Sequence, residues 1–217
     1  WRHGGKKTIA GNQLTVTLPA GAEPTTAYLW HGTVSDSANS WNVDASGDWG
    51  TNGNWNPASA PGATSGTANA DVATFGFTLT ADRVVTVDAN RNIGGITFSN
   101  TSTSKFSLNG GNLLLSNGGV IQTATGNGNH TDTISTAIQI QGNGGAAAFT
   151  AGATSPTSLL SIADVTGVST GTSVTTLTLN GANTGGNNIS GVIGNGAGGG
   201  KLAITKSDAG TWILGGT

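Results

Sequence analysis

The chain has no cysteine and no methionine, and only 8 basic and 10 acidic side chains stand among its 217 residues. The lack of cysteine excludes a disulfide scaffold. Eight scattered lysines and arginines do not build the basic patch that a nucleic-acid binder needs. The single glutamate, Glu23, and the missing 3.6-residue apolar period exclude a coiled coil or helical bundle. Apolar runs are too short to span a membrane.

Small and β-branched residues are abundant instead. Glycine (37 residues), threonine (34), asparagine (21) and serine (19) make up about half of the chain, and the net charge is only −2. Short aliphatic stretches recur between Gly and Asn clusters, a pattern typical of many short strands joined by tight turns. The low net charge and the many β-branched residues argue against charge-driven disorder. At 35% hydrophobic residues, the composition suits a thin, elongated core.

The alternation of apolar and polar residues predicts strands and no amphipathic helix. Near the N-terminus, residues 13–18 form an amphipathic strand pattern that places Leu14, Val16 and Leu18 on one face. Residues 30–61 are predicted as loops pinned by aromatic side chains. From residue 71 onward we predict strands at 71–75, 83–88, 95–99, 106–108, 112–116, 119–123, 133–140, 146–150, 158–162, 174–179, 188–193, 201–205 and 211–214.

A loose internal repeat marks the ends of four of these strands. It reads apolar-x-apolar, then a small or amide residue, then Gly, and its copies start at Phe106, Ile138, Leu177 and Trp212. Asn-Gly pairs suit turn positions with positive φ. Strands that must align while their turns vary in length are typical of stacked β-coils.

These features predict an all-β fold, a right-handed parallel β-solenoid (β-helix) with a Trp-rich N-terminal cap. In a solenoid each coil pairs with the coils above and below, so a short strand needs only one or two inward aliphatic residues, and outward Thr and Asn stack in ladders. The alternative is an antiparallel β-sandwich or jelly roll, which normally has longer alternating strands and more core aromatics. We divide the chain into an extension (1–29), a Trp-rich cap region (30–69) and solenoid repeats (70–217).

Residues 177–217 carry Ser190-Gly191-Val192-Ile193, a Gly198–Gly200 run before Lys201-Leu202, and Gly210-Thr211-Trp212-Ile213-Leu214. In this order, these elements resemble the autotransporter-associated β-strand repeat of bacterial passenger proteins. Residues 41–115 resemble, less closely, the region that often precedes such repeats. The resemblance implies a secreted β-solenoid at a bacterial surface, acting as a stalk or adhesin.

One departure from the family pattern concerns the last repeat. Family repeats continue past the Trp-x-Leu strand into another turn and strand, whereas this sequence stops at Gly216-Thr217. We therefore expect the last repeat to be incomplete and the chain to be a fragment, a processed subunit or part of something longer.

Residues that could carry chemistry are few. Asp44, Ser46 and Asp48 alternate as in a calcium loop, but Trp49 and Trp55 occupy the positions where that loop has Gly and Glu, so a polar turn is the competing interpretation. His3, His31 and His130 lie far apart, and Asp132 is predicted to stand alone in a turn. No pair of carboxylates has the spacing of a catalytic pair. We expect no enzymatic activity, no cofactor and no metal.

Four of the six tryptophans fall within 26 residues: Trp30, Trp41, Trp49 and Trp55. They either cover the open end of the solenoid or stack on sugar rings. The function that we expect is non-enzymatic and extracellular, a surface stalk or fibre-forming subunit. The alternatives are an adhesin or carbohydrate-binding module and, third, a polysaccharide-degrading β-helix enzyme. Expected partners are copies of the chain joined head to tail through Leu14, Val16 and Leu18, the rest of a longer parent chain, or surface glycans, with no nucleic acid and no membrane insertion.

Overall fold

The computed structural model describes residues 7–10, 13–16, 38–142 and 144–216 of the chain. The chain divides into two units, residues 1–36 and 37–217. In the first unit, β1 (Lys7–Ala10) and β2 (Gln13–Val16) form an antiparallel hairpin in which Lys7 pairs with Val16. Leu18 and Trp30 lie outside the described residues.

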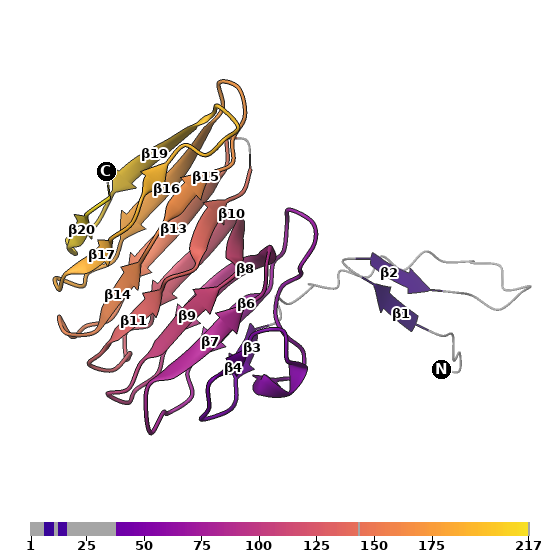
Figure 1. Cartoon of the computed structure of the whole chain (residues 1–217), viewed down its shortest axis with the longest axis vertical. Helices are drawn as coiled ribbons and strands as arrows, with labels where there is room; N and C mark the ends of the chain where they lie inside the picture. Colours follow the sequence, from indigo (N-terminus) through magenta and orange to yellow (C-terminus); the bar gives the residue numbers. More distant parts are fainter. Residues whose placement is uncertain (1–6, 11–12, 17–37, 143, 217) are drawn as a thin grey trace, which may run out of the picture. The chain divides into compact units, whose positions relative to one another are not determined.

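The second unit is a stack of about five coils, each of which passes through three faces (Figure 1). Face 1 contains β4 (Gly47–Asp48), β7 (Arg83–Val87), β9 (Phe106–Gly110), β11 (Thr131–Ile134), β14 (Leu159–Ile162), β17 (Asn187–Ile189) and β20 (Trp212–Leu214). Face 2 contains the first halves of β8 (Arg91–Phe98) and β10 (Asn112–Thr123), then β12 (Ala137–Ile140), β15 (Val165–Gly167) and β18 (Ile193–Gly194). Face 3 contains β3 (Ala38–Trp41), β6 (Val72–Phe75), the second halves of β8 and β10, β13 (Ala146–Ala151), β16 (Val174–Asn180) and β19 (Lys201–Lys206).

We number the coils in chain order: coil 1 (β7, β8), coil 2 (β9, β10), coil 3 (β11–β13), coil 4 (β14–β16) and coil 5 (β17–β19). Strands of successive coils pair in parallel on all three faces. The predicted parallel β-solenoid is therefore confirmed, and the antiparallel sandwich is wrong. Among the described residues of this unit, antiparallel pairing occurs only at short contacts: β3 with β5 (Trp55–Asn56), which follows the 3₁₀ turn η1 (Asn52–Asn54), and two isolated bridges.

Strand alternation builds the core as columns of inward side chains. On face 1 one column is aliphatic from coil 1 to coil 5, and all of its members are fully buried: Val85, Leu108, Ile134, Ile162 and Ile189. A second column, on face 3, runs through Ala73, Ile96, Ile121, Phe149 and Leu179. Each coil thus adds a few side chains to a continuous apolar interior, which explains how 35% hydrophobic residues suffice.

The spacing between copies of the strand-end repeat does not equal the number of residues in one coil. Its copies at Phe106, Ile138, Leu177 and Trp212 fall on faces 1, 2, 3 and 1. The register gives the coil length, because Arg83 pairs with Phe106 and Thr131 with Leu159, separations of 23 and 28 residues. The signature recurs because corners on different faces need the same glycine, and three of its glycines have φ between +86° and +103°: Gly110, Gly142 and Gly181.

The corners also explain where the predicted strand limits differ from the structure. The pattern over 133–140 predicts one strand, but the chain turns between β11 and β12 and divides it between two faces. Conversely, 112–116 and 119–123 form the single strand β10, which bends at a register shift and pairs with β12 and then β13. The short strands β1, β3, β4, β5 and β15 are missing from the prediction.

Alanine at Gly181 should destabilise the solenoid much more than alanine at Gly118. Both glycines have positive φ, so both substitutions carry a backbone strain of about 1–2 kcal/mol. A Cβ at Gly181 would lie 2.2 Å from the Ala151 carbonyl oxygen of the preceding coil, whereas a Cβ at Gly118 meets open space. We expect Gly181→Ala to lower the free energy of unfolding, measured with urea, by about 1–3 kcal/mol more than Gly118→Ala does. Equal losses would contradict the close approach of the two coils.

Candidate functional site

The three described tryptophans of the Trp-rich region close the N-terminal end of the solenoid. Trp41, Trp49 and Trp55 are at most 2% exposed and pack on Phe75, with ring centroids 5.6–6.1 Å from it. Phe75 in turn stacks on Phe98 of coil 1 at 5.5 Å. The aromatic cluster therefore continues the coil interior, and none of these three rings offers a free face to a sugar.

Backbone pairing also ends at this end of the solenoid. On face 3, β5 covers the outer edge of β3 in antiparallel orientation. On face 2, Ala63 and Asn92 exchange backbone hydrogen bonds of 3.0 and 2.7 Å in an antiparallel bridge. The indole N–H of Trp49 donates to the Pro61 carbonyl at 2.9 Å and so holds the covering loop. Because these partners run antiparallel, another parallel coil cannot simply be added on faces 2 and 3.

The C-terminal end differs, because β18, β19 and β20 each pair on one side only within the described residues. The aliphatic column of face 1 continues to Leu214, which is 47% exposed, and Ile204 of β19 is 37% exposed. In the face 3 column, Lys206 follows Leu179 at an inward position. Its Nζ donates to the backbone carbonyls of Ser207 and Asp208.

The carboxylate of Asp44, the first residue of the calcium candidate, is bound by coil 1. It accepts hydrogen bonds from the Thr80 hydroxyl at 2.6 Å and from Arg83 Nε at 2.8 Å, and the Arg83 guanidinium also forms an ion pair with it at 2.7 Å. The Thr80 hydrogen bond, followed by the one from Arg83, lowers the pKa of Asp44 below its usual range. A cation in the same place would face the guanidinium.

The other two calcium candidates have separate surroundings. The Ser46 hydroxyl accepts the backbone N–H of Val84 at 2.9 Å, again tying the first face 1 segment to coil 1. The Asp48 side chain is exposed on β4, and its backbone carbonyl accepts the Asn54 amide at 3.0 Å. Within the described ranges, no group of three or more His, Cys, Asp or Glu side chains gathers in a way that could hold a metal ion.

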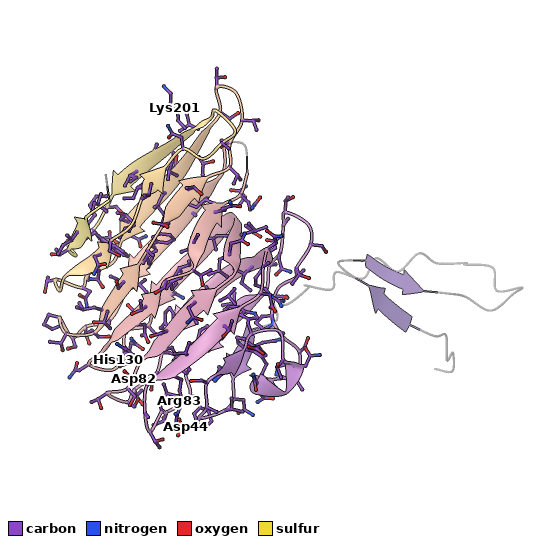
Figure 2. All side chains as sticks on the ribbon, in the orientation of Figure 1. Asp44, Asp82, Arg83, His130 and Lys201 are labelled. Carbon is purple, nitrogen blue, oxygen red and sulfur yellow. The ribbon has the colours of Figure 1, made fainter. Side chains whose placement is uncertain are left out.

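Charged side chains of successive coils meet at the corner where face 3 turns into face 1. Figure 2 shows Asp44, Arg83, Asp82 and His130 along this rim, with Lys201 at the opposite end of the solenoid. The exposed pair Asp82–Lys105, at 3.8 Å, adds to the Asp44–Arg83 pair. Exposed ion pairs individually contribute little to folding stability. The same corner, however, also contains a fully buried pair.

That buried pair is His130 and Asp132, with side chains 3% and 0% exposed and His130 Nε2 3.0 Å from Asp132 Oδ2. The other carboxylate oxygen, Oδ1, accepts the backbone N–H of Phe106 at 3.0 Å. Asn127 Nδ2 donates to Asp132 Oδ2 at 2.9 Å and to the Ser158 hydroxyl at 3.2 Å. The cluster therefore links corners of three consecutive coils.

Sequence reasoning missed this cluster, since it left His130 without a partner and Asp132 in an isolated turn. The signal was the alternation in β11, where Asp132 has the same inward parity as buried Ile134. Coil 5 repeats the arrangement without charge. Asn187 is buried at the equivalent inward position, accepts the Leu160 N–H at 3.0 Å and donates to Asn183 Oδ1 at 3.0 Å.

The outward side of the faces consists of polar ladders. On face 3 the register aligns Thr74, Thr97, Gln122, Thr150 and Asn180. Gln122 donates to the Thr97 hydroxyl at 3.1 Å, and on face 1 Ser161 donates to Asn188 at 2.9 Å. These bonds run between coils, so the ladders stabilise the stack as well as forming its surface.

No family model, no curated protein and no solved structure matches the chain. The resemblance of residues 177–217 and 41–115 to the autotransporter-associated repeat therefore stays a prediction. In the described part of the chain no helix is both long and apolar enough to cross a membrane.

Replacing Trp49 by alanine should cost about 3–5 kcal/mol of unfolding free energy, because a fully buried indole leaves a large cavity. Trp212→Ala, at the half-buried position on β20, should cost clearly less. Urea unfolding followed by circular dichroism measures both. A Trp49→Ala variant of unchanged stability that has lost binding to an immobilised glycan would instead favour sugar stacking.

The thermal unfolding midpoint should be the same in millimolar calcium as in the presence of a chelator. The Asp44 carboxylate is already bound by Thr80 and Arg83, and Ser46 by a backbone N–H. Differential scanning fluorimetry with Arg83→Ala as the comparison variant tests this reason. A calcium-dependent rise in the wild-type midpoint would contradict it.

Proposed function

We propose that this chain is a non-enzymatic structural module of an extracellular, bacterial surface assembly, in which the β-solenoid acts as a stalk or fibre-forming segment. The observation that carries the proposal is the asymmetry of the two ends. Antiparallel strands and buried indoles close the N-terminal end, whereas the last described strands, β18, β19 and β20, each pair on one side only and carry half-exposed aliphatic side chains. Such strand edges suit extension by pairing.

The lateral surface supports the same role. Outward ladders of Thr, Ser, Asn and Gln carry hydrogen bonds along the stack, and few charges oppose association. Against the enzyme alternative, three of the described aspartates already have a basic partner: Asp44 pairs with Arg83, Asp88 with Arg91 and Asp132 with His130. The carbohydrate-binding alternative lacks exposed rings at its three described tryptophans.

The proposed partner is a second copy of the chain. Direct stacking of one solenoid on another would need an open N-terminal end, which antiparallel pairing closes on faces 2 and 3. The hairpin β1–β2 offers another route, because a lone two-stranded hairpin is marginally stable and gains from a third strand. Strand β2 carries no charge, and by alternation Leu14 and Val16 share one face. Its addition to the β19 edge of another copy would make a head-to-tail joint.

Deleting residues 1–18 should leave a folded solenoid that no longer self-associates. The solenoid keeps its own core, while the donor strand is lost. Multi-angle light scattering over a concentration series measures the assembly, and circular dichroism checks the fold. Two matched pairs sharpen the test. Leu14→Lys and Ile204→Lys should abolish association, whereas Thr15→Lys and Thr205→Lys, one residue along and on the opposite face by alternation, should weaken it less.

Two results would overturn the self-association proposal. One is an intact chain that stays monomeric at the highest concentration reached. The other is assembly that persists unchanged after the deletion. Release of reducing sugar from a polysaccharide by the purified chain would overturn the non-enzymatic role itself.

A further inference from the structure

The His130 cluster holds together three successive corners between face 3 and face 1. His130 Nδ1 lies 3.0 Å from the Ser102 carbonyl oxygen, in the corner that precedes coil 2. Asp132 Oδ1 holds the Phe106 N–H at the start of the coil 2 strand β9. Asn127 reaches forward to Ser158, in the corner that precedes coil 4. A change at His130 therefore acts on the joint between coils 2 and 3.

Both ring nitrogens of His130 lie within hydrogen-bond distance of an oxygen acceptor: Nδ1 is 3.0 Å from the Ser102 carbonyl oxygen and Nε2 is 3.0 Å from the Asp132 carboxylate. A donor nitrogen, Asn127 Nδ2, also lies 3.4 Å from Nε2, but its two hydrogens have nearer acceptors in Asp132 at 2.9 Å and Ser158 at 3.2 Å. Only the imidazolium form donates from both nitrogens. A neutral ring would turn a lone pair either toward the Ser102 carbonyl or toward the Asp132 carboxylate. The second case also leaves a fully buried carboxylate without its counter-charge, which is costly.

The surrounding charges act in the same direction. Asp132 on β11 contacts the ring, and Asp82 on the rim acts at longer range, with Lys105 of the neighbouring corner 3.8 Å from Asp82. The next coil contributes the neutral Ser158 hydroxyl. Burial by itself lowers the pKa of His130, but the hydrogen bond and charge of Asp132, with the Ser102 carbonyl and Asp82, outweigh it and raise the pKa above its ordinary 6.5.

We propose that His130 is a pH-dependent lock between coils 2 and 3, closed while the imidazole is protonated and released when it loses its proton. Stability from a group whose pKa is raised on folding is fully present below the unfolded pKa. It is lost as pH rises through the folded pKa. Because coils interact mainly with their neighbours, the release opens this corner locally rather than unfolding the stack.

Coil 5 supplies a control within the same molecule. Asn187 accepts the Leu160 N–H as Asp132 accepts the Phe106 N–H, both at 3.0 Å and both at the first inward position of face 1. The coil 5 arrangement contains no titrating group among these partners, since Asn187 bonds to the Asn183 amide. Leu160 is the register partner of Asp132, but its N–H is held by the neutral Asn187, so its protection should depend less on the His130 proton than the protection of Phe106 does.

Hydrogen exchange of the two amides tests the lock. The experiment uses the full chain and compares protection factors, corrected for intrinsic exchange, from about pH 5.5 to about pH 8.5. We expect the ratio of Phe106 to Leu160 protection to fall as pH rises through the folded-state pKa of His130. Asp132→Asn should make the ratio constant, because the new amide can bond to both the Phe106 N–H and a neutral ring.

The titration of the ring provides a second measurement that does not depend on the variant. The His130 imidazole signal, assigned by its absence in His130→Gln, should titrate above 6.5, the ordinary pKa of histidine. A constant protection ratio in the wild type would overturn the proposal. So would a His130 pKa at or below 6.5, or a pH-dependent ratio that survives in a folded Asp132→Asn variant.

Discussion

Parallel backbone pairing between coils is the constraint on which the rest of this structure depends. Each coil satisfies its backbone only through the coils on either side, so the stack necessarily has two ends where hydrogen-bonding edges and apolar columns stop. The N-terminal end meets this requirement with antiparallel strand β5, the Ala63–Asn92 bridge and three buried indoles. In the last described coil, Lys206 occupies the position that Leu179 holds in coil 4 and so places a charge on strand β19, a feature typical of edge strands.

The same constraint explains why polar side chains occur inside. A corner between faces bends the chain away from regular pairing and leaves backbone N–H groups in the interior. Asp132 and Asn187 accept two of these groups, those of Phe106 and Leu160. Asn does this without charge, whereas Asp brings a buried charge that a cationic partner must balance. His130 supplies it, and the fold thereby acquires a charged corner in coil 3 and a neutral one in coil 5.

The outward surface follows from the stacking as well. Side chains at equivalent positions of successive coils are neighbours, so a polar ladder bonds to itself, as Gln122 does with Thr97. The small polar side chains of such a ladder are hydrated without being charged, and they fit side by side on neighbouring strands. The low charge of the chain is thus a property of its architecture, and it also lowers the repulsion that would oppose association between copies.

The sequence by itself determined the class of fold. Short alternating stretches and corner glycines such as Gly110 and Gly181 indicate strands and turns, because local backbone geometry depends on residues that are adjacent in the sequence. The tertiary structure alone decided which face each strand joins, because coil length depends on pairing between residues 22 to 30 positions apart, from Arg91–Leu113 to Ala146–Thr176. It also decided that Trp49 lies inside and that His130 meets Asp132 and Ser102, since burial and partnership arise from coils that the chain brings together only on folding.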